Sequence, residues 1–301
     1  MCYYNGQKVT RAEYIRLKQM ERAVKNFNFL DKGVISGFTD TQVAVIVATP
    51  DKTNFDIVQM EWGFIPNYLN NREEVKRMRT GYKDEKTGKW VQGQPQLNAK
   101  SENLFVSERS GRRSMFYDAA KHRRCLILST GYFDWRHVYR NHKKTGERLK
   151  TPDKYPYYVS LPEHEYFFMA GIWNPWTDKE TGEMVNTVAL VTTVANPLMM
   201  QVHNSKERMP AILNDDLAWR WISEELSDED ILQIAATQFP YQEMNACTVA
   251  SDFLGKLDPA EPFVFENLPA LALDIEPAAL DVDGQVADVP VVTPPQGDLF
   301  S

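Results

Sequence analysis

Residues 124–135 read RCLILSTGYFDW and contain two short apolar runs on either side of a Ser-Thr-Gly break. The runs Leu126–Leu128 and Tyr132–Trp135 have the aliphatic and aromatic composition that is typical of β-strands. Further runs of this kind are Thr41–Ala48, Ile57–Trp62, Tyr155–Ser160, Tyr166–Ile172 and Thr187–Val194. Because these runs are short and follow no repeated βαβ rhythm, we expect an α+β fold with a largely antiparallel sheet.

Helices are predicted where a capping side chain precedes an apolar stretch. Thr10 and Glu13 have the spacing of a capping box, and apolar residues recur three or four apart over residues 14–27, so we expect the first helix there. The polar, glycine-bearing segment 83–96 is expected to be a loop. Later capping positions are Asn196, Asn214 and Ser227. Asn196 is followed by a proline, and we expect a short helix to run from there toward His203.

Charges and prolines divide the 301-residue chain at about residue 257. The formal net charge is −7, but residues 257–301 hold nine Asp or Glu, no Lys or Arg, and seven of the 17 prolines. Such a composition does not form a packed core, so we expect a disordered acidic tail there. Because 43% of all residues are apolar, the remainder supports a sizeable core. We expect one domain over residues 1–240 and a domain end or linker over 241–256.

The sequence argues against several classes of protein. No apolar run approaches the ~18 residues of a membrane helix, and the N-terminus lacks the apolar region of a signal peptide. The three cysteines, Cys2, Cys125 and Cys247, form no CxxC pair, which argues against a disulfide framework or a Cys-based zinc site. We therefore expect a cytoplasmic protein that uses no metal and no cofactor.

Residues 109–150 are strongly basic, with twelve Lys or Arg against three Asp or Glu. A concentrated basic stretch in an otherwise near-neutral body is suited to binding phosphate. A solvated face with a flexible loop around residues 141–150 explains the same composition, and charge alone favours this plainer interpretation.

Cys2 directly follows the initiator methionine. Aminopeptidases remove Met before small residues, so we expect the mature chain to begin with Cys2 and to carry a free α-amine beside its thiol. The reference pKa values of these groups, about 7.7–8.0 and 8.5, leave a usable fraction of each unprotonated near neutral pH. Such an aminothiol condenses with an aldehyde to a Schiff base, which the thiolate then closes to a thiazolidine. The alternative is an incidental cysteine near a frayed terminus.

An ordered series of motifs accompanies this cysteine. They are WGFIP at 62–66, NAKSE at 98–102, RCLIL and GYFDW within 124–135, AGIW at 170–173, and TTVAN, VH and RMPAIL within 192–213. Each motif alone is weak, but together with Met1-Cys2 the series resembles the SRAP (SOS-response-associated peptidase) family over roughly residues 1–240. The resemblance implies a single SRAP-like domain with a curved, largely antiparallel β core flanked by helices.

The resemblance implies that the protein binds single-stranded DNA, often at junctions with duplex, and shields abasic sites by cross-linking to them during the DNA damage response. Cys2 is then the nucleophile, Asn98 holds the sugar and the Cys amine, Asp134 shuttles protons, and His203 assists imine formation. A position near a helix C-terminus should favour the imidazolium form of His203. The implied DNA contacts are Trp62, Pro66, Lys100, Arg124, Thr193 and Arg208.

The family also bears on partners and further activities. It implies a monomer that works in the bacterial cytoplasm and associates with the nucleoid during repair. Lyase activity at the Schiff base is compatible with the resemblance. The only peptidase activity that we would expect is the release of Met1.

Several positions depart from the family pattern. Tyr3-Tyr4 stand where Gly-Arg usually follows the cysteine, so a cation near the abasic 3′ phosphate is missing or is replaced by a stacking ring. Asp134 replaces a longer Glu, and Lys100 replaces an Arg. Four residues separate His203 from Arg208, more than is common in the family.

The chain ends in PPQGDLFS, residues 294–301. Gln296, Leu299 and Phe300 have the pattern of the peptide by which bacterial repair proteins bind the β sliding clamp. A disordered tether of about 30 residues would let such a peptide reach a clamp tens of ångströms away. We therefore interpret residues 296–300 as a clamp-binding peptide, against the alternative of an arbitrary chain end.

Two other functional classes stay open at this point. An N-terminal-nucleophile amidohydrolase or peptidase also begins Met-Cys, and it predicts a four-layer αββα sandwich. A non-covalent DNA-binding module would use residues 109–150 and leave Cys2 inert. Replacing Cys2 by Ala separates the three hypotheses, because only the cross-linking protein would keep its DNA affinity and lose a covalent product.

Overall fold

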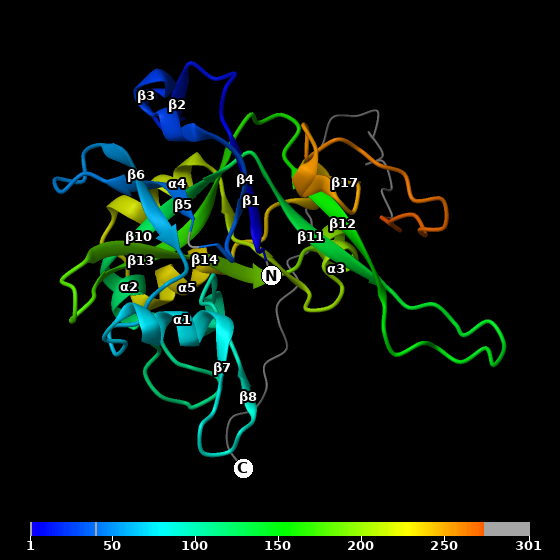
Figure 1. Ribbon diagram of the computed structural model, residues 1–301. Helices are drawn as coiled ribbons and strands as arrows, with labels where there is room; N and C mark the ends of the chain where they lie inside the picture. Colours follow the sequence, from blue (N-terminus) through cyan, green and yellow to red (C-terminus); the bar gives the residue numbers. More distant parts are fainter. Residues whose placement is uncertain (1, 40, 274–301) are drawn as a thin grey trace, which may run out of the picture. The chain divides into compact units, whose positions relative to one another are not determined.

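Two β-sheets form the body of the protein, and the larger one closes on itself (Figure 1). The computed structural model describes residues 2–39 and 41–273. In the larger sheet β13 pairs with both β10 and β14, so that β14, β6, β5, β10 and β13 form a ring. In order, its strands are β15 (Arg208–Pro210), β14 (Met184–Val194), β6 (Phe55–Trp62), β5 (Gln42–Ala48), β10 (Arg124–Ser129), β13 (Phe167–Thr177) and β16 (Ile212–Leu213), with β9 (Asn98–Lys100) beside β14.

The smaller sheet carries the N-terminus and is antiparallel throughout. Its order is β17 (Asn245–Thr248), β12 (Asp153–Ser160), β11 (Gly131–Val138), β1 (Tyr4–Lys8) and β4 (Asp31–Ser36). In the larger sheet β14 runs parallel to β6 and β9, and its other pairs are antiparallel. The expected α+β fold with a largely antiparallel core is therefore confirmed.

Within residues 2–39 and 41–273, four of the five helices begin at a side chain that caps the first turn. These are α1 (Arg72–Thr80), α3 (Pro197–Val202), α4 (Asp215–Ser223) and α5 (Asp228–Ala235), whereas α2 (Tyr117–His122) has no such cap. Asn196, Asn214 and Ser227 each accept a backbone N–H, which confirms the three later predicted helix starts. Short 3-10 turns are η1 (Val24–Asn26), η2 (Asn28–Leu30), η3 (Ser101–Asn103), η4 (Tyr241–Glu243) and η5 (Phe253–Gly255).

The helix predicted over residues 14–27 was wrong. The segment forms a hairpin of β2 (Tyr14–Leu17) and β3 (Met20–Ala23), followed by η1. Ile15 and Leu17 are buried and alternate with exposed residues, a period of two that the wider apolar spacing hid. Lys18 makes the turn with a positive φ of 57°.

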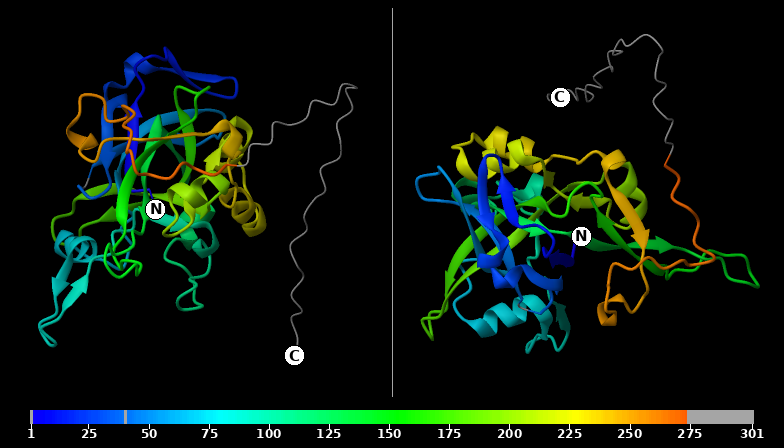
Figure 2. Two further views of the ribbon diagram at one scale, coloured as in Figure 1. Left: turned by 90° about the vertical axis from the view of Figure 1, so that its right-hand side faces the viewer. Right: turned by 90° about the horizontal axis from the view of Figure 1, so that it is seen from above.

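The expected loop at 83–96 also contains a hairpin, of β7 (Gly81–Lys83) and β8 (Trp90–Gln92). Its turn is stabilised by Asp84, whose carboxylate accepts hydrogen bonds from the backbone and the hydroxyl of Thr87. The basic residues 141–150 form an exposed arm beyond β11, with a bridge between Asn141 and Arg148 and backbone hydrogen bonds on either side of it. Figure 2 shows this arm projecting from the body.

The main hydrophobic core lies between the closed sheet and helices α2, α4 and α5. Trp221 of α4 is fully buried there, and its indole N–H donates to the carbonyl oxygens of Cys125 and Gly171. A second cluster, Phe133, Val249 and Phe253, covers the other face of β11. Successive side chains of β11 therefore point to opposite sides, and Tyr132 and Asp134 face away from this cluster.

The compact part of the chain continues to Leu271, beyond the expected start of the tail at 257. β17 pairs with β12, and Phe263 donates its backbone N–H to the Thr248 carbonyl oxygen at 2.8 Å. Residues 272–301 are assigned to a separate unit, of which the structure describes only 272 and 273. The predicted clamp-binding residues Gln296, Leu299 and Phe300 lie outside the described residues. No helix of the described part is long and apolar enough to cross a membrane.

Candidate active site at the N-terminus

Cys2 is positioned by β1, which lies between β4 and β11. The pairing of Tyr4 with Phe133 brings the residues before β1 alongside Asp134. Cys2 is only 1% exposed, and its Sγ lies 3.5 Å from the Tyr4 carbonyl oxygen. Burial, and next the charge of Asp134, raise the pKa of the Cys2 thiol well above its ordinary value. The thiol is therefore protonated in this closed arrangement.

Asn98 reaches Cys2 from the other sheet. It begins β9, which pairs in parallel with β14 and so runs along the rim of the closed sheet. Its side-chain amide donates to the Cys2 carbonyl oxygen at 3.0 Å. Its Oδ1 is buried and accepts no hydrogen bond from the residues that the structure describes. The Asn98 Oδ1 is therefore available to accept a hydrogen bond beside the backbone of Cys2.

Asp134 and His203 form a buried pair next to Cys2. Asp134 lies on β11, and His203 caps the C-terminus of α3, which packs against β11. The His203 Nδ1 is 3.6 Å from Asp134 Oδ2 and 2.9 Å from the Arg208 carbonyl oxygen. The shorter contact identifies Nδ1 as the hydrogen-bond donor, so Nε2 is the basic nitrogen of the neutral ring.

Burial shifts both members of this pair toward their neutral forms. It raises the pKa of Asp134, in spite of the neighbouring His203, and it lowers the pKa of His203, in spite of the neighbouring Asp134. The prediction that the helix C-terminus would favour the imidazolium form was wrong, because desolvation outweighs the helix end in this buried position. The pair can therefore exchange a proton at modest cost.

The turn between His203 and Arg208 is anchored to β11 by a residue that sequence reasoning missed. Asn204 accepts the His137 backbone N–H and donates to the His137 carbonyl oxygen, both at 2.9 Å. Glu207 closes the turn with a positive φ of 52°, and its N–H donates to the His203 carbonyl oxygen. The four intervening residues thus hold the imidazole against the strand that carries Asp134. Only the position of Asn204 beside His203 could have suggested it.

Tyr132 is a second residue that the sequence did not single out. It is fully buried, lies two residues before Asp134 on the same side of β11, and its hydroxyl has no hydrogen-bond partner among residues 2–39 and 41–273. Burial, and next the charges of Asp134 and Cys2, raise the pKa of Tyr132. A buried, unsatisfied hydroxyl costs stability, which makes it a candidate for ligand contact.

Four of the expected DNA contacts are engaged within the protein. Trp62 is 2% exposed and donates its indole N–H to the Leu97 carbonyl oxygen, and Pro66 is also buried. Thr193 is 2% exposed and donates to the Ala236 carbonyl oxygen. Arg124 donates to the carbonyl oxygens of Ala120, Lys121, Trp221 and Glu224 at the ends of α2 and α4. Burial lowers the pKa of Arg124 to about 10, so it stays charged as a helix cap.

The two remaining candidate contacts are paired with carboxylates. Arg208 forms a two-pronged bridge with Glu102 at 2.7 and 2.8 Å and also donates to the Thr192 carbonyl oxygen. Arg208 holds the pKa of Glu102 below its usual value, although burial acts in the opposite direction. Lys100 is 42% exposed in its side chain and contacts Glu108 at 3.0 Å. Of the two, only Lys100 is exposed enough to turn toward a phosphate.

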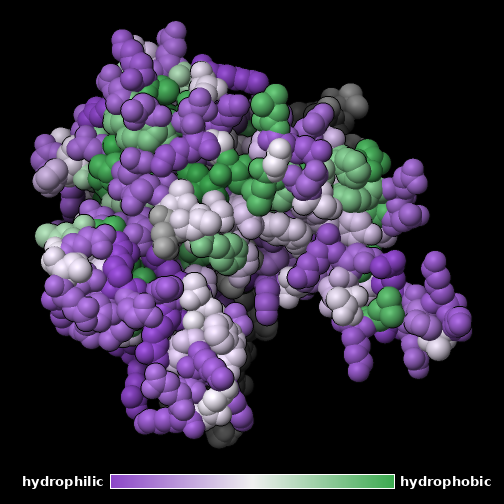
Figure 3. All heavy atoms as spheres, in the orientation of Figure 1, coloured by the Kyte–Doolittle hydropathy of each residue, from purple (hydrophilic) through white to green (hydrophobic). Residues whose placement is uncertain are grey.

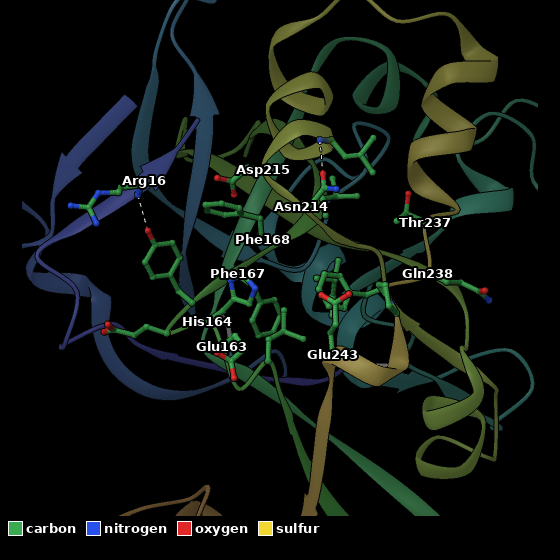
Figure 4. Close-up of a pocket in the computed structure, with 18 residues that line it drawn as sticks. Arg16, Glu163, His164, Phe167, Phe168, Asn214, Asp215, Thr237, Gln238 and Glu243 are labelled. Carbon is green, nitrogen blue, oxygen red and sulfur yellow. Dashed lines mark hydrogen bonds between the residues drawn. The ribbon is translucent and has the colours of Figure 1, made fainter. Parts of the chain in front are cut away.

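A separate cleft of about 630 Å³ lies on another part of the body (Figure 4). It is lined by residues of the β12–β13 connection and the start of α4, including Glu163, His164, Phe167 and Asp215, and by none of Cys2, Asn98, Asp134 and His203. Within the described part of the chain, no three His, Cys, Asp or Glu side chains are grouped to hold a metal ion.

Comparison with known proteins gives the family. The model of the SOS response associated peptidase (SRAP) family matches residues 9–254. The chain belongs to the SRAP family. The matched range contains Asn98, Asp134 and His203. The predicted family is therefore confirmed, and the fold differs from the αββα sandwich of the amidohydrolase alternative.

Individual relatives cover most of the chain. The abasic site processing protein YoqW of Bacillus subtilis is 27% identical over 69% of this chain and 75% of its own length. The abasic site processing protein YedK of Escherichia coli is 26% identical over 79% of this chain and 86% of its own length. A crystal structure of a Bacteroides thetaiotaomicron protein has a TM-score of 0.63 and 26% identity, covering 87% of this chain and all of that one.

Proposed function

We propose that this SRAP protein processes abasic sites in DNA by bonding covalently to them through Cys2 once Met1 has been removed. The observation that supports it most strongly is the hydrogen bond from Asn98 to Cys2, because it fixes residue 2 beside a buried acid–base pair. The names of the relatives point to the same substrate, since YoqW and YedK are called abasic site processing proteins.

The chemistry needs no redox partner. The α-amine of Cys2 adds to the C1′ aldehyde of the ring-opened sugar, and loss of water gives the imine. The thiol sulfur then bonds to the imine carbon, its proton passes to the nitrogen, and a thiazolidine results. One water leaves overall, and the five-membered ring locks an imine that water would otherwise hydrolyse.

The neighbouring side chains are suited to these steps. The Asn98 Oδ1 can accept an N–H of the Cys2 amine and orient its lone pair toward the aldehyde. Asp134, whose pKa is raised, can donate a proton to the sugar oxygen as the ring opens and the carbonyl is attacked. Neutral His203 can take the proton that the amine releases, because Asp134 stabilises the imidazolium that forms.

Denaturing electrophoresis with a single-stranded oligonucleotide that carries one abasic site tests the proposal. We expect a heat-stable shifted band with the wild type and none with Cys2→Ala. Cys2→Ser should give a band only after borohydride reduction, because its amine forms an imine that no thiol closes. Cys247→Ala is the matched control, since this cysteine is half-buried in β17, and it should cross-link as the wild type does.

Intact mass must accompany these lanes. If Met1 is absent by mass and the wild type still gives no band, covalent processing through Cys2 is wrong. A band of equal strength from Cys2→Ala would likewise contradict it, because another nucleophile would then be responsible.

A further inference from the structure

Four aromatic side chains gather beside Cys2 and form what we call the aromatic patch: Tyr3, Tyr4, Phe38 and Trp135. The ring centres of Tyr3 and Phe38 are 5.0 Å apart, those of Tyr4 and Phe38 6.1 Å, and those of Tyr4 and Trp135 5.4 Å. Phe38 is 53% exposed, and the other three are half-buried. Figure 3 shows hydrophobic and neutral residues in the middle of this face, with hydrophilic residues around them.

The patch is held in place by the backbone. The Gly37 N–H donates to the Tyr3 carbonyl oxygen at 2.9 Å, which ties the turn after β4 to the residue next to Cys2. A Cβ at Gly37 would lie 2.7 Å from the Leu97 side chain, so the glycine lets this turn approach the chain leading into Asn98 without displacing Leu97. The Phe38 N–H donates to Ser36 Oγ, and about half of the Phe38 surface stays exposed.

The chemistry of the patch favours an uncharged, flat ligand. None of its four members is a cation. Burial, and next the charge of Asp134, raise the pKa of Tyr3, so its phenol stays neutral. A phosphate would find no positive charge on the patch itself, whereas a nucleobase can stack on an aromatic ring regardless of its sequence.

The reaction defines which base would be in reach. In the proposed function, C1′ of the abasic sugar becomes bonded to Cys2, and Tyr3 is the next residue, one Cα–Cα step of about 3.8 Å away. Stacked bases repeat at about 3.4 Å along a strand. The base next to the abasic nucleotide therefore arrives at the aromatic patch. Because the abasic nucleotide has no base, one face of this neighbouring base has no stacking partner within the strand.

We propose that the aromatic patch binds the nucleobase adjacent to the abasic nucleotide by stacking, mainly through Phe38 and Tyr3. This inference rests on the proposed function, because that function places the abasic sugar at Cys2. It assigns the Tyr3-Tyr4 departure from the family pattern to a stacking contact in place of a phosphate contact. Recognition is then sensitive to the presence of the neighbouring base.

The test measures non-covalent binding, so that it does not depend on cross-linking. The probe is a fluorescent single strand with a tetrahydrofuran site, an abasic analogue that has no aldehyde, flanked on both sides by adenine. In a second probe, further tetrahydrofuran units replace both flanking adenines. We expect the wild type to bind the first probe about 5- to 150-fold more tightly, the range that one base–aromatic stack supplies.

Phe38→Ala should bring this ratio close to one, and Phe38→Trp should preserve it. Tyr14→Ala is the matched control, because Tyr14 is an exposed ring on β2, which Figures 1 and 2 show well away from the N-terminus. It should keep the wild-type ratio. Because Phe38 is half exposed, we expect its variants to keep the thermal midpoint of the wild type.

Three outcomes would overturn the inference. The first is a wild-type ratio near one, and the second is an unchanged ratio in Phe38→Ala. The third is a dimer by sedimentation that Phe38→Ala converts to a monomer, which would make the patch a contact between two copies of the chain. A wild type that binds with the expected ratio but does not cross-link a true abasic site would instead contradict the proposed function alone.

Discussion

The hydroxyl of Tyr132 and the carboxylate of Asp134 lie on the same side of β11, and burial raises the pKa of both groups. A protein interior rarely keeps a polar hydroxyl without a partner, because desolvation of such a group costs about 1–3 kcal/mol. The Tyr132 hydroxyl has no hydrogen-bond partner among the described residues, and it lies on the side of β11 that carries Asp134. The stability lost by burying this unsatisfied hydroxyl is best explained by a contact that the hydroxyl makes with a bound ligand.

Replacing Tyr132 with Phe separates the effect of the hydroxyl on stability from its effect on the reaction. The substitution keeps the ring and removes only the unsatisfied hydroxyl, so we expect the free energy of unfolding to rise by about 1 kcal/mol. The cross-linking rate on an abasic oligonucleotide should fall several-fold at the same time. Thermal unfolding and single-turnover gels measure the two effects, and a lowered thermal midpoint would show instead that the hydroxyl has a structural partner.

The structure shows which of the predicted site residues lie together and which are engaged elsewhere in the protein. Cys2, Asn98, Asp134 and His203 were singled out by motif and chemistry, and the structure brings them together, although their roles stay proposals. The family resemblance implied that Arg124 contacts DNA. Its guanidinium instead caps two helix ends, and no property of the sequence alone shows which carbonyl groups lie within its reach.

At the scale of elements, the turn after α3 determines where the imidazole of His203 sits. Helix α3 is only six residues long, so its end cannot hold a side chain rigidly by itself. The two hydrogen bonds between Asn204 and the His137 backbone fix the turn to β11. The distance between His203 and Asp134 thus depends on a side chain that touches neither.

Asn204→Ala should therefore affect the reaction more than the fold. Loss of two largely exposed hydrogen bonds costs about 1 kcal/mol of unfolding free energy. We expect the cross-linking rate to drop several-fold and its pH profile to change, since the surroundings of His203 loosen. Asn141→Ala, an exposed asparagine on the basic arm, is the matched control and should match the wild type in both. Equal rates for the two variants would contradict a positioning role.

Element prediction from this sequence depended on which period the apolar residues follow. Helix starts at Asn196, Asn214 and Ser227 were predicted because a cap is a local signal. The hairpin of β2 and β3 was missed because Tyr14, Leu17 and Met20 also fit a helical spacing. Burial of Ile15 and Leu17 against the core selects the strand, and that selection is tertiary.

At the scale of the whole molecule, the site exists because distant parts of the chain close two sheets against each other. Asn98 comes from the rim of the closed sheet, whereas Cys2 and Asp134 come from the smaller sheet. The sequence predicted antiparallel strands but not this closure, because β14 must pair with β6, β9, β13 and β15 at once. Such long-range pairing leaves no local pattern.

The smaller sheet also depends on the chain after residue 256. Thr248 exchanges hydrogen bonds with Phe263, Phe265 packs edge-on against Tyr155 at 5.0 Å, and Arg136 donates to the Pro269 carbonyl oxygen. These contacts attach residues 257–271 to strands β11, β12 and β17. The folded domain therefore ends near 271, later than its composition suggested.

Two truncations test this boundary. A chain ending at residue 273 should unfold at the midpoint of the full-length protein and cross-link at its rate. A chain ending at residue 256 loses about three hydrogen bonds and the packing of Phe265 on Tyr155, so we expect its unfolding free energy to fall by about 3 kcal/mol. Urea unfolding measures the difference. Equal stability of the two chains would show that residues 257–271 lie on the sheet without supporting it, and it would move the domain end back to β17 and η5.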